Sequence, residues 1–356
     1  MFNVQHLNFS VQLIRWQRAH GRHQLPWQNT HDPYAIWLSE IMLQQTRVAT
    51  VIPYYLRFLR CFPDLKSLSL ASLDEVLALW SGLGYYSRGR NLYKTARLIV
   101  SDHHGIFPQK IEVIQQFPGI GRSTAAAIEV FAYGKRCAIL DGNVKRVLVR
   151  YFGMEGYPGE KKTEVLLWKK AEELLPKNNV RGNIEAYSQA LMDLGATLCT
   201  RTKPKCIVCP IQRECVAFRE HREDKLPIHR PCKPLLVKET VMLMIIRRSE
   251  ILLERRPLTG IWGGLWCLPE MPANENVFLY CTQRFGIKIK LLAHMPSIDH
   301  TFTHFKLRIY PRSLQVVSQI SKISQSGQIW ISFTGALEAA IPTPVRNLLN
   351  SNCSLK

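Results

Sequence analysis

From about residue 8 to residue 218, apolar side chains recur at every third or fourth position, which is the period of an amphipathic helix. Runs of β-branched residues, which would indicate strands, are nearly absent from this part of the chain. The pattern therefore predicts a first domain over residues 1–217 that is built from helices alone.

After residue 234 the pattern changes to short apolar or β-branched runs. These runs predict a hairpin followed by further strands, at residues 239–248, 250–256, 288–293 and 305–311. We expect a second domain of the α+β class over residues 235–350. Residues 218–234 are charged, contain proline and carry few apolar side chains, so this segment is the expected linker.

Charge narrows the class of partner. Lys and Arg number 47 against 27 Asp and Glu, a net charge of +20, which favours a polyanion such as nucleic acid. No apolar run approaches the roughly 20 residues that cross a bilayer, and the N-terminus lacks the apolar core of a signal peptide. We expect a cytoplasmic monomer with no membrane partner, associated with the nucleoid if the protein is bacterial.

Four of the ten cysteines lie close together in a loop, at Cys199, Cys206, Cys209 and Cys215. In a reducing compartment this spacing indicates a metal site at residues 199–215 rather than disulfides. Four thiolates suit both a zinc ion and an iron–sulfur cube, and the spacing lacks the paired C-x2-C modules of a zinc ribbon. From the residues alone, both metals remain open.

Gly119 and Gly121 flank Ile120 directly before a helix that is expected to begin near Arg122. Their N–H groups and the helix N-terminus can bind a DNA phosphate, although an ordinary turn between helices has the same pattern. Twenty residues beyond Gly121, Asp141 precedes another predicted helix, where the role of a simple N-cap would also explain it.

Residues 33–46 contain one charged side chain, Glu40, in an otherwise apolar or neutral helix. A lone carboxyl in such a helix is expected to be partly buried and to favour its protonated form. The alternative is a single exposed Glu on an amphipathic helix.

Along the chain, the glycine hairpin comes first, Asp141 second and the cysteine loop third. This order and spacing resemble those of the endonuclease III and MutY superfamily of helix-hairpin-helix glycosylases. The resemblance implies one [4Fe-4S] cluster held by the four cysteines and DNA phosphate bound at Gly119 and Gly121. It also implies that Asp141 is a catalytic carboxylate, which Asn143 orients. The fold it implies is an all-α glycosylase domain that includes the cluster loop.

The segment LSEIMLQQT around Glu40 resembles the signature of adenine glycosylases of the MutY type, in which the equivalent Glu is a general acid. Adenine leaves poorly unless a nitrogen of its imidazole ring is protonated, and the sugar then develops oxocarbenium character. Glu40 would donate the proton and Asp141 would stabilise the cation. Superfamily members that also cut the backbone carry a lysine where this chain has Ser123, so the resemblance implies a monofunctional enzyme.

An enzyme that acts on a base within a duplex must flip it out and fill the gap. Three residues resemble the family's intercalating side chains: Gln45, Leu83 and Tyr85. Three others resemble the wall of its adenine pocket: Trp27, Gln28 and Glu185. Many relatives carry Arg at the position of Gln28.

The segment 258–270 resembles the opening of a Nudix fold, but residues 271–287 carry too few carboxylates for a Nudix hydrolase. We therefore interpret this domain as a Nudix-like module that recognises 8-oxoguanine. Phe302, Thr303 and His304 match the family's loop that reads this base in the opposite strand, with Thr303 where relatives commonly have Ser.

The expected function is monofunctional removal of adenine from double-stranded DNA in base excision repair, where adenine is paired with 8-oxoguanine or guanine. An endonuclease III-like pyrimidine glycosylase with lyase activity is the enzymatic alternative, opposed by Ser123 and by the additional domain. A non-catalytic iron–sulfur protein that binds damaged DNA is the alternative from another class. The presence of both Glu40 and Asp141 argues against it.

Overall fold

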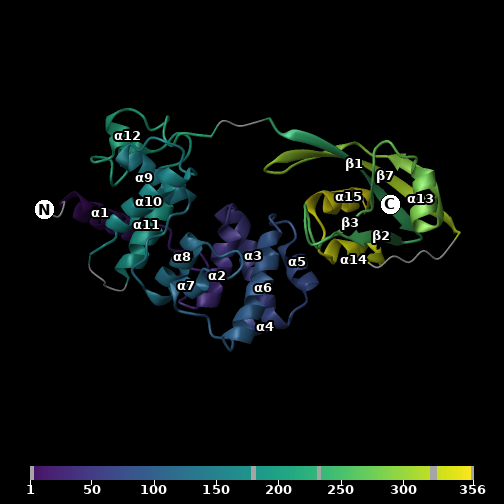
Figure 1. Cartoon of the computed structure of the whole chain (residues 1–356), viewed down its shortest axis with the longest axis horizontal. Helices are drawn as coiled ribbons and strands as arrows, with labels where there is room; N and C mark the ends of the chain where they lie inside the picture. The colour runs from purple at the N-terminus through teal and green to yellow at the C-terminus, as the bar shows by residue number, and fades with distance from the viewer. Residues whose placement is uncertain (1–3, 178–181, 231–233, 321–326, 354–356) are drawn as a thin grey trace. The chain divides into compact units, whose positions relative to one another are not determined.

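The computed structural model describes residues 4–177, 182–230, 234–320 and 327–353 (Figure 1). The chain forms two compact units. Unit 1 comprises Met1–Leu70 and Lys94–Pro231, and unit 2 comprises Ala71–Tyr93 and Cys232–Lys356. The segment Ala71–Tyr93 therefore groups with unit 2, although the helical pattern of the sequence extends through it without a break. Residues 231–233 of the expected linker lie outside the described residues.

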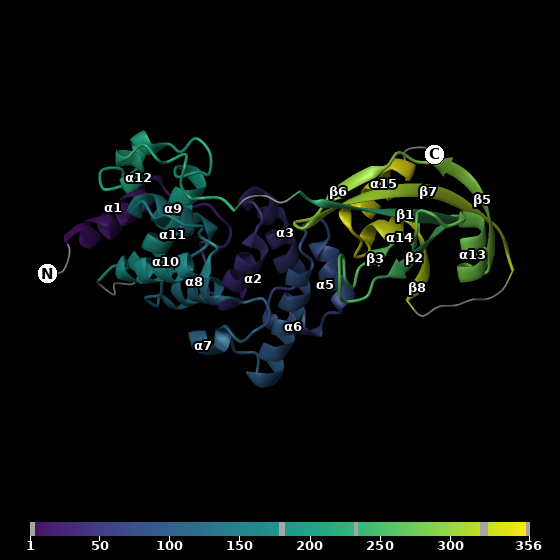
Figure 2. The same cartoon turned by 45° about the horizontal axis from the view of Figure 1, so that its top comes forward.

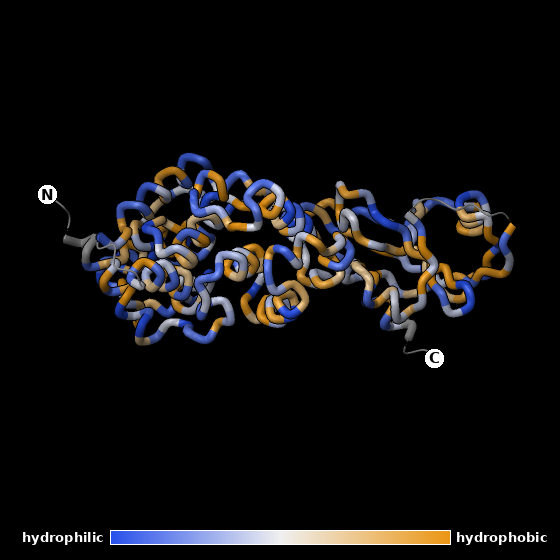
Figure 3. The backbone as a smooth tube through the Cα atoms, turned by 90° about the horizontal axis from the view of Figure 1, so that it is seen from below, coloured by the Kyte–Doolittle hydropathy of each residue, from blue (hydrophilic) through white to orange (hydrophobic). Residues whose placement is uncertain are grey.

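Unit 1 consists of helices, as the three-to-four-residue period predicted. They are α1 (Val4–His20), α2 (Pro33–Leu43), α3 (Val48–Cys61), α4 (Leu65–Leu70), α7 (Ile111–Ile114), α8 (Arg122–Tyr133), α9 (Gly142–Phe152), α10 (Lys161–Glu173), α11 (Asn183–Thr197), η1 (Cys206–Val208) and α12 (Val216–Arg219). Helix α5 (Leu73–Trp80) belongs to unit 2, and α6 (Ser87–Asp102) begins in unit 2 and ends in unit 1. Hydrophilic and hydrophobic residues are interspersed along the chain (Figure 3).

Two helices that matter for the site have well-defined ends. Helices α8 and α9 both finish on a glycine in the left-handed conformation, Gly134 with φ of 62° and Gly153 with φ of 63°. Helix α9 begins after Asp141, whose side chain accepts a hydrogen bond from the backbone N–H of Val144. Local sequence chemistry thus fixes where α9 starts and stops.

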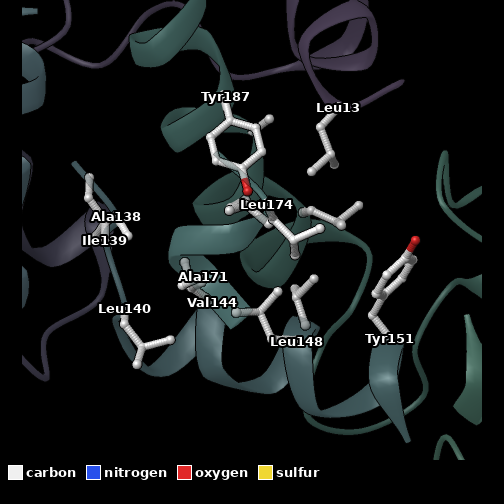
Figure 4. Close-up of a cluster of buried hydrophobic side chains, with 14 of the residues drawn as sticks. Leu13, Ala138, Ile139, Leu140, Val144, Leu148, Tyr151, Ala171, Leu174 and Tyr187 are labelled. Carbon is white, nitrogen blue, oxygen red and sulfur yellow. The ribbon is translucent and has the colours of Figure 1, made fainter. Parts of the chain in front are cut away.

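One hydrophobic core of unit 1 lies among α1, α8, α9, α10 and α11. Figure 4 shows Val144 and Leu148 of α9 on the side that faces Leu174 and Tyr187. The extended residues before α9, including Leu140, are buried in the same cluster. Because the chain on both sides of Asp141 is anchored in this core, the position of its carboxyl is fixed by packing as well as by the helix cap.

Unit 2 is built on an eight-stranded mixed sheet with the order β3-β2-β1-β7-β5, and β4, β6 and β8 pair with β1, β7 and β2 respectively. The strands are β1 (Leu236–Arg247), β2 (Glu250–Arg255), β3 (Trp266–Cys267), β4 (Glu270–Met271), β5 (Ile287–His294), β6 (Ile298–Thr301), β7 (Phe305–Gln319) and β8 (Gln328–Ser332). The expected hairpin is present as antiparallel β1 and β2. Strands β1 and β7 pair in parallel, with Val241 opposite Tyr310.

Besides α5 and the start of α6, unit 2 contains α13 (Val277–Phe285), α14 (Phe333–Glu338) and α15 (Thr343–Cys353). Cys281 and Phe285 of α13 pack with Val241 and Leu314 of the sheet in a second hydrophobic core. Helix α13 lies beside β5, whereas α14 packs against β2 and β8 (Figure 2). The part of unit 2 that follows residue 234 is thus of the α+β class that the sequence predicted.

No helix within the described part of the chain combines the length and the apolar character needed to cross a membrane.

Candidate active site

Unit 1 contains a pocket of about 960 Å³. Its walls come from the segment between α1 and α2, from α2 and the turn after it, from the N-terminal part of α9, and from residues along α8 and α11. Seven of the predicted site residues and Asp141 line it: Trp27, Gln28, Glu40, Gln45, Ser123, Asn143 and Glu185. Segments as distant as residues 27 and 185 therefore meet around one space.

Asp141 is held by its own helix. Its Oδ1 accepts the Val144 backbone N–H at 2.7 Å, and its Oδ2 accepts the side-chain amide of Asn143 at 3.0 Å. Burial raises the pKa of Asp141, while both hydrogen bonds and the nearby Arg146 oppose that rise. The N-cap interpretation of Asp141 is therefore correct, and the same carboxyl also faces the pocket.

Glu40 lies on α2 and is half-buried, with its carboxyl at the pocket. Burial, together with the negative charge of Asp141, raises the pKa of Glu40 to about 8. Among the described residues no hydrogen bond or ion pair stabilises the ionised form of Glu40, in contrast to Asp141. Burial thus raises the pKa of both carboxyls, but only Asp141 accepts hydrogen bonds that oppose the rise, so the two carboxyls lie in different environments.

Ser123 sits in the first turn of α8, and its hydroxyl accepts the backbone N–H of Leu140 at 3.1 Å. This bond joins the start of α8 to the residue that precedes Asp141. A serine hydroxyl in this position cannot form a Schiff base, and its acceptor lone pair is used in holding the chain.

The two glycines of the hairpin precede α8. Gly119 has a φ of 82°, a conformation that strongly favours glycine, and Gly121 is the N-cap of α8. Both residues are exposed, and Gln44 at the end of α2 donates its side-chain amide to the Gly119 carbonyl at 3.3 Å. The hairpin thus leaves N–H groups at a helix N-terminus open to solvent, the arrangement that phosphate binding requires.

Trp27 and Gln28 differ in what they do in the pocket wall. Trp27 is buried and packs edge-on against Tyr55, with ring centroids 5.4 Å apart. The Gln28 side chain accepts the Leu25 N–H at 3.1 Å and donates to the Arg22 carbonyl at 2.8 Å. Gln28 therefore closes a turn of its own backbone. It makes these contacts at a position where many relatives carry Arg.

Gln45 and Glu185 stand at other parts of the pocket. Gln45 is exposed and has a φ of 56°, an unusual conformation for a residue other than glycine. Glu185 accepts the backbone N–H of Gly182 at 2.7 Å and so caps α11. Gln189, one turn later on the same helix, also lines the pocket and was missed in the sequence.

The four cysteines of the loop line one common cavity in unit 1. Burial raises the pKa of Cys206 to about 11 and that of Cys209 to about 12, and the neighbouring thiols add to the rise at Cys209. Thiols that hold their protons so tightly require a strong positive centre to become thiolates together. Among the described residues, no three His, Cys, Asp or Glu side chains are gathered closely enough to hold a single metal ion.

Arg146 and Arg150, both on α9, bind the cysteine loop and were not predicted, and Arg146 also lines the pocket. Arg146 donates to Oδ1 of Asn143 at 2.8 Å and to the Cys199 carbonyl at 2.7 Å. Arg150 is buried and donates to Sγ of Cys199 at 3.3 Å and to the Leu226 carbonyl at 2.8 Å. An arginine on the buried face of an amphipathic helix is a signal that the sequence does offer, because a buried charge needs partners.

The two remaining intercalation candidates belong to unit 2 and are not among the residues that line the pocket. Leu83 is only 5% exposed, so it would have to leave its packing to enter a duplex. Tyr85 is 48% exposed and has a φ of 46°. Of these two, Tyr85 alone is already presented at the surface.

Phe302, Thr303 and His304 form the turn between β6 and β7 in unit 2. The turn is closed by a hydrogen bond from the Phe302 N–H to the Phe305 carbonyl at 2.8 Å. Thr303 and His304 are exposed, whereas Phe302 is half-buried and stacks on Phe305 with ring centroids 4.7 Å apart.

Known families match both parts of the chain. Residues 38–173 match the HhH-GPD superfamily of base excision DNA repair proteins, and residues 241–351 match the NUDIX domain. Among solved structures, a thermostable thymine-DNA glycosylase is similar at 29% identity with a TM-score of 0.55, covering 61% of this chain and 97% of that one. An endonuclease III–DNA complex, at 18% identity and a TM-score of 0.52, shares the fold of 62% of this chain.

Relatives that match almost the whole chain indicate its family more specifically than the domain matches do. The adenine DNA glycosylase of Buchnera aphidicola subsp. Acyrthosiphon pisum is 39% identical over 345 residues, which cover 96% of this chain and 97% of the relative. The human adenine DNA glycosylase is 31% identical and covers 96% of this chain and 73% of the relative. Identity of this extent along almost the whole length confirms the resemblance drawn from the motifs, and the chain belongs to the adenine DNA glycosylase family.

Proposed function

We propose that this protein is a monofunctional adenine DNA glycosylase of base excision repair, which hydrolyses the glycosidic bond of adenine paired with 8-oxoguanine or guanine in double-stranded DNA. The observation that carries the proposal is the pair of carboxyls in one pocket: Glu40, whose pKa is raised to about 8, and Asp141, which accepts two hydrogen bonds. Two carboxyls with different proton affinities can perform opposite tasks at neutral pH.

In the proposed reaction, Glu40 transfers its proton to a ring nitrogen of the flipped adenine as the bond from that base to the anomeric carbon breaks. The ionised Asp141 stabilises the positive charge that develops on the sugar. Water then adds its oxygen to the anomeric carbon and releases a proton. Asn143 keeps the Asp141 carboxylate oriented through the 3.0 Å hydrogen bond.

The pocket of about 960 Å³ is large enough for a flipped nucleotide, with Trp27, Gln28 and Glu185 in its wall. Tyr85 and Gln45, both exposed and both with positive φ, suit insertion into the gap that the adenine leaves. We assign contact with DNA phosphate to the exposed hairpin at Gly119 and Gly121. The buried Leu83 side chain must first leave its packing before it can insert into the duplex.

Monofunctional chemistry is favoured over the lyase alternative by two observations. The Ser123 hydroxyl is engaged with the Leu140 N–H. Lys145, the nearest conceivable amine on α9, is paired with Glu164 at 2.5 Å and is not among the described residues that line the pocket. A Schiff base therefore has no evident nucleophile here.

Specificity for 8-oxoguanine is assigned to the turn Phe302–His304 of unit 2. Thr303 and His304 are exposed and offer a hydroxyl and a ring nitrogen for hydrogen bonds to the opposite base. Thr303 keeps the hydroxyl of the Ser that is common in relatives and adds a methyl group.

We further propose that Cys199, Cys206, Cys209 and Cys215 hold one [4Fe-4S] cluster. The fit rests on four partly buried thiols around one cavity and on Arg150, which brings a positive charge and an N–H group to Cys199. Four cysteine thiolates are ligands that suit an iron–sulfur cluster, and the spacing of the four residues lacks the paired C-x2-C modules of a zinc ribbon. When bound, the cluster would supply a structural centre that keeps the loop folded.

The test is a single-turnover assay on a duplex with adenine opposite 8-oxoguanine, using Glu40→Gln and Asp141→Asn. We expect each variant to lose at least about 100-fold in rate. Glu112→Gln is the matched control, because Glu112 is an exposed carboxyl on α7 outside the pocket. Unchanged rates in both pocket variants would refute the assignment.

A further inference from the structure

Trp262, in the loop between β2 and β3, combines burial with a strained backbone. Its side chain is 6% exposed, and its φ is +54°. A bulky L residue rarely adopts this conformation, because its Cβ crowds the backbone. Such strain persists only where the surrounding structure enforces it, and it is concentrated at functional sites.

The surrounding structure does enforce it. Arg256 binds the loop at two points. Its backbone N–H donates to the Leu265 carbonyl at 2.8 Å, and its side-chain Nε donates to the Ile261 carbonyl at 3.2 Å. The Trp262 carbonyl accepts the Leu265 N–H at 3.0 Å. Gly263 leaves no room for a side chain, because a Cβ there would lie 2.4 Å from the Leu258 carbonyl oxygen.

Further contacts hold Arg256 and the loop in place. The Arg256 guanidinium pairs with Glu270 at 2.5 Å and lies 5.7 Å from the centre of the Trp262 ring. Arg90, from the helical part of unit 2, donates to the Gly263 carbonyl at 2.6 Å. The loop is therefore fixed on both sides of Trp262.

The strained conformation directs the indole to the β6–β7 turn. The Trp262 ring centroid is 5.6 Å from that of His300 and 5.4 Å from that of Phe302. Phe302 in turn lies 4.7 Å from His300 and stacks on Phe305 at 4.7 Å. The flanks of the turn are thus clamped by aromatic contacts, while Thr303 and His304 between them remain exposed.

We propose that Trp262 is a positioning residue for recognition of the base opposite adenine. It does not touch that base; it fixes Phe302, and so sets where the Thr303 hydroxyl and the His304 ring stand. Phe302 is held by ring contacts with Trp262, His300 and Phe305 and by its N–H bond to the Phe305 carbonyl. The inference rests on the proposed function of the turn.

The experiment uses the full chain and measures two quantities for each variant. The first is the ratio of the dissociation constants for duplexes with guanine and with 8-oxoguanine opposite an adenine nucleotide that resists hydrolysis. The second is the single-turnover rate on an adenine:guanine duplex at saturating enzyme. Trp262→Gly removes the ring and relieves the backbone strain, Trp262→Phe keeps an aromatic ring, and Trp330→Ala is the control for losing a large aromatic side chain elsewhere in unit 2.

We expect Trp262→Gly to lower the preference for 8-oxoguanine about tenfold, with the adenine:guanine rate within about twofold of the wild type. Trp262→Phe should retain most of the preference, and Trp330→Ala should retain all of it. An unchanged preference in Trp262→Gly, or an equal loss in Trp330→Ala, would overturn the inference.

His304→Ala separates this inference from the proposed function. If His304→Ala lowers the preference for 8-oxoguanine and Trp262→Gly does not, the turn recognises the base but Trp262 does not position it. If His304→Ala and Thr303→Val both leave the preference unchanged, the turn does not read the base, and the role of Trp262 falls with it.

Discussion

The Asn143 side chain donates to Oδ2 of Asp141 at 3.0 Å and, through its own Oδ1, accepts from Arg146 at 2.8 Å. Arg146 also donates to the Cys199 carbonyl. A short chain of hydrogen bonds therefore joins the carboxylate in the pocket to the cysteine loop.

Replacing Asn143 by Ala should slow adenine release about 10-fold to 100-fold, because Asp141 loses the donor that orients its carboxylate. DNA affinity should change little. Single-turnover rates and binding to an uncleavable duplex measure the two effects. Asn183→Ala is the control, since Asn183 binds Arg18 outside the pocket; equal losses in both variants would contradict the role of Asn143.

Glu40 should make both activity and stability depend on pH. The protonated acid is the active form, so the single-turnover rate should fall as pH rises through about 8. Because the pKa of Glu40 in the folded state lies above its ordinary value of 4.5, the folded state binds the extra proton, and the free energy of unfolding should decline as pH rises from about 4.5 to about 8.

Glu40→Gln removes this titration. The variant should be inactive, and near pH 8 it should be more stable than the wild type in denaturant titrations, with a weaker dependence on pH. A wild-type rate that stays flat to pH 9 would count against a proton held by Glu40.

The wild-type enzyme should release adenine without cutting the DNA strand, because the Ser123 hydroxyl cannot form a Schiff base. The product strand should break only after hot alkali, and borohydride should trap no covalent adduct. An endonuclease III-type lyase, tested beside it on its own substrate, is the positive control. A borohydride-dependent adduct would instead reveal an unrecognised amine nucleophile.

Arg150→Met should weaken retention of the cluster, because the loop loses the bonds from Arg150 to Sγ of Cys199 and to the Thr200 carbonyl. We expect less iron per chain after dialysis, weaker visible absorption and a lower Tm. Arg219→Met is the control, as Arg219 is an exposed arginine on α12 next to the loop. Stoichiometric zinc in a colourless wild-type protein would refute the cluster itself.

Thr303→Val keeps the shape of the side chain and removes its hydroxyl, so it should lower the preference for 8-oxoguanine over guanine about tenfold. Thr303→Ser should retain the preference. Thr301→Val tests the same change on an exposed threonine of β6, two residues away. Point variants are more informative than deletion of residues 235–356, because deletion would also remove the contact between Ser81 and the Ile341 carbonyl within unit 2.

Several features of this protein are determined by sequence alone because they depend on near neighbours along the chain. The helical period of unit 1, the β1–β2 hairpin and the capping of α9 by Asp141 are of this kind. The spacing of Cys199, Cys206, Cys209 and Cys215 likewise brings four thiols around one cavity. Local backbone preference and short loops are sufficient for each of them.

Tertiary structure decided the pKa of Glu40 and the side-chain contacts around the pocket. These properties depend on which residues, distant in the sequence, pack together. Glu40 and Asp141 are 101 positions apart, and only packing makes the charge of one act on the pKa of the other. Packing also turns Gln28 toward its own backbone, joins Arg146 to the cysteine loop, and places Trp262 against Phe302. Hydrogen-bond partners and strain of this kind follow from the fold as a whole, and no periodicity in the sequence encodes them.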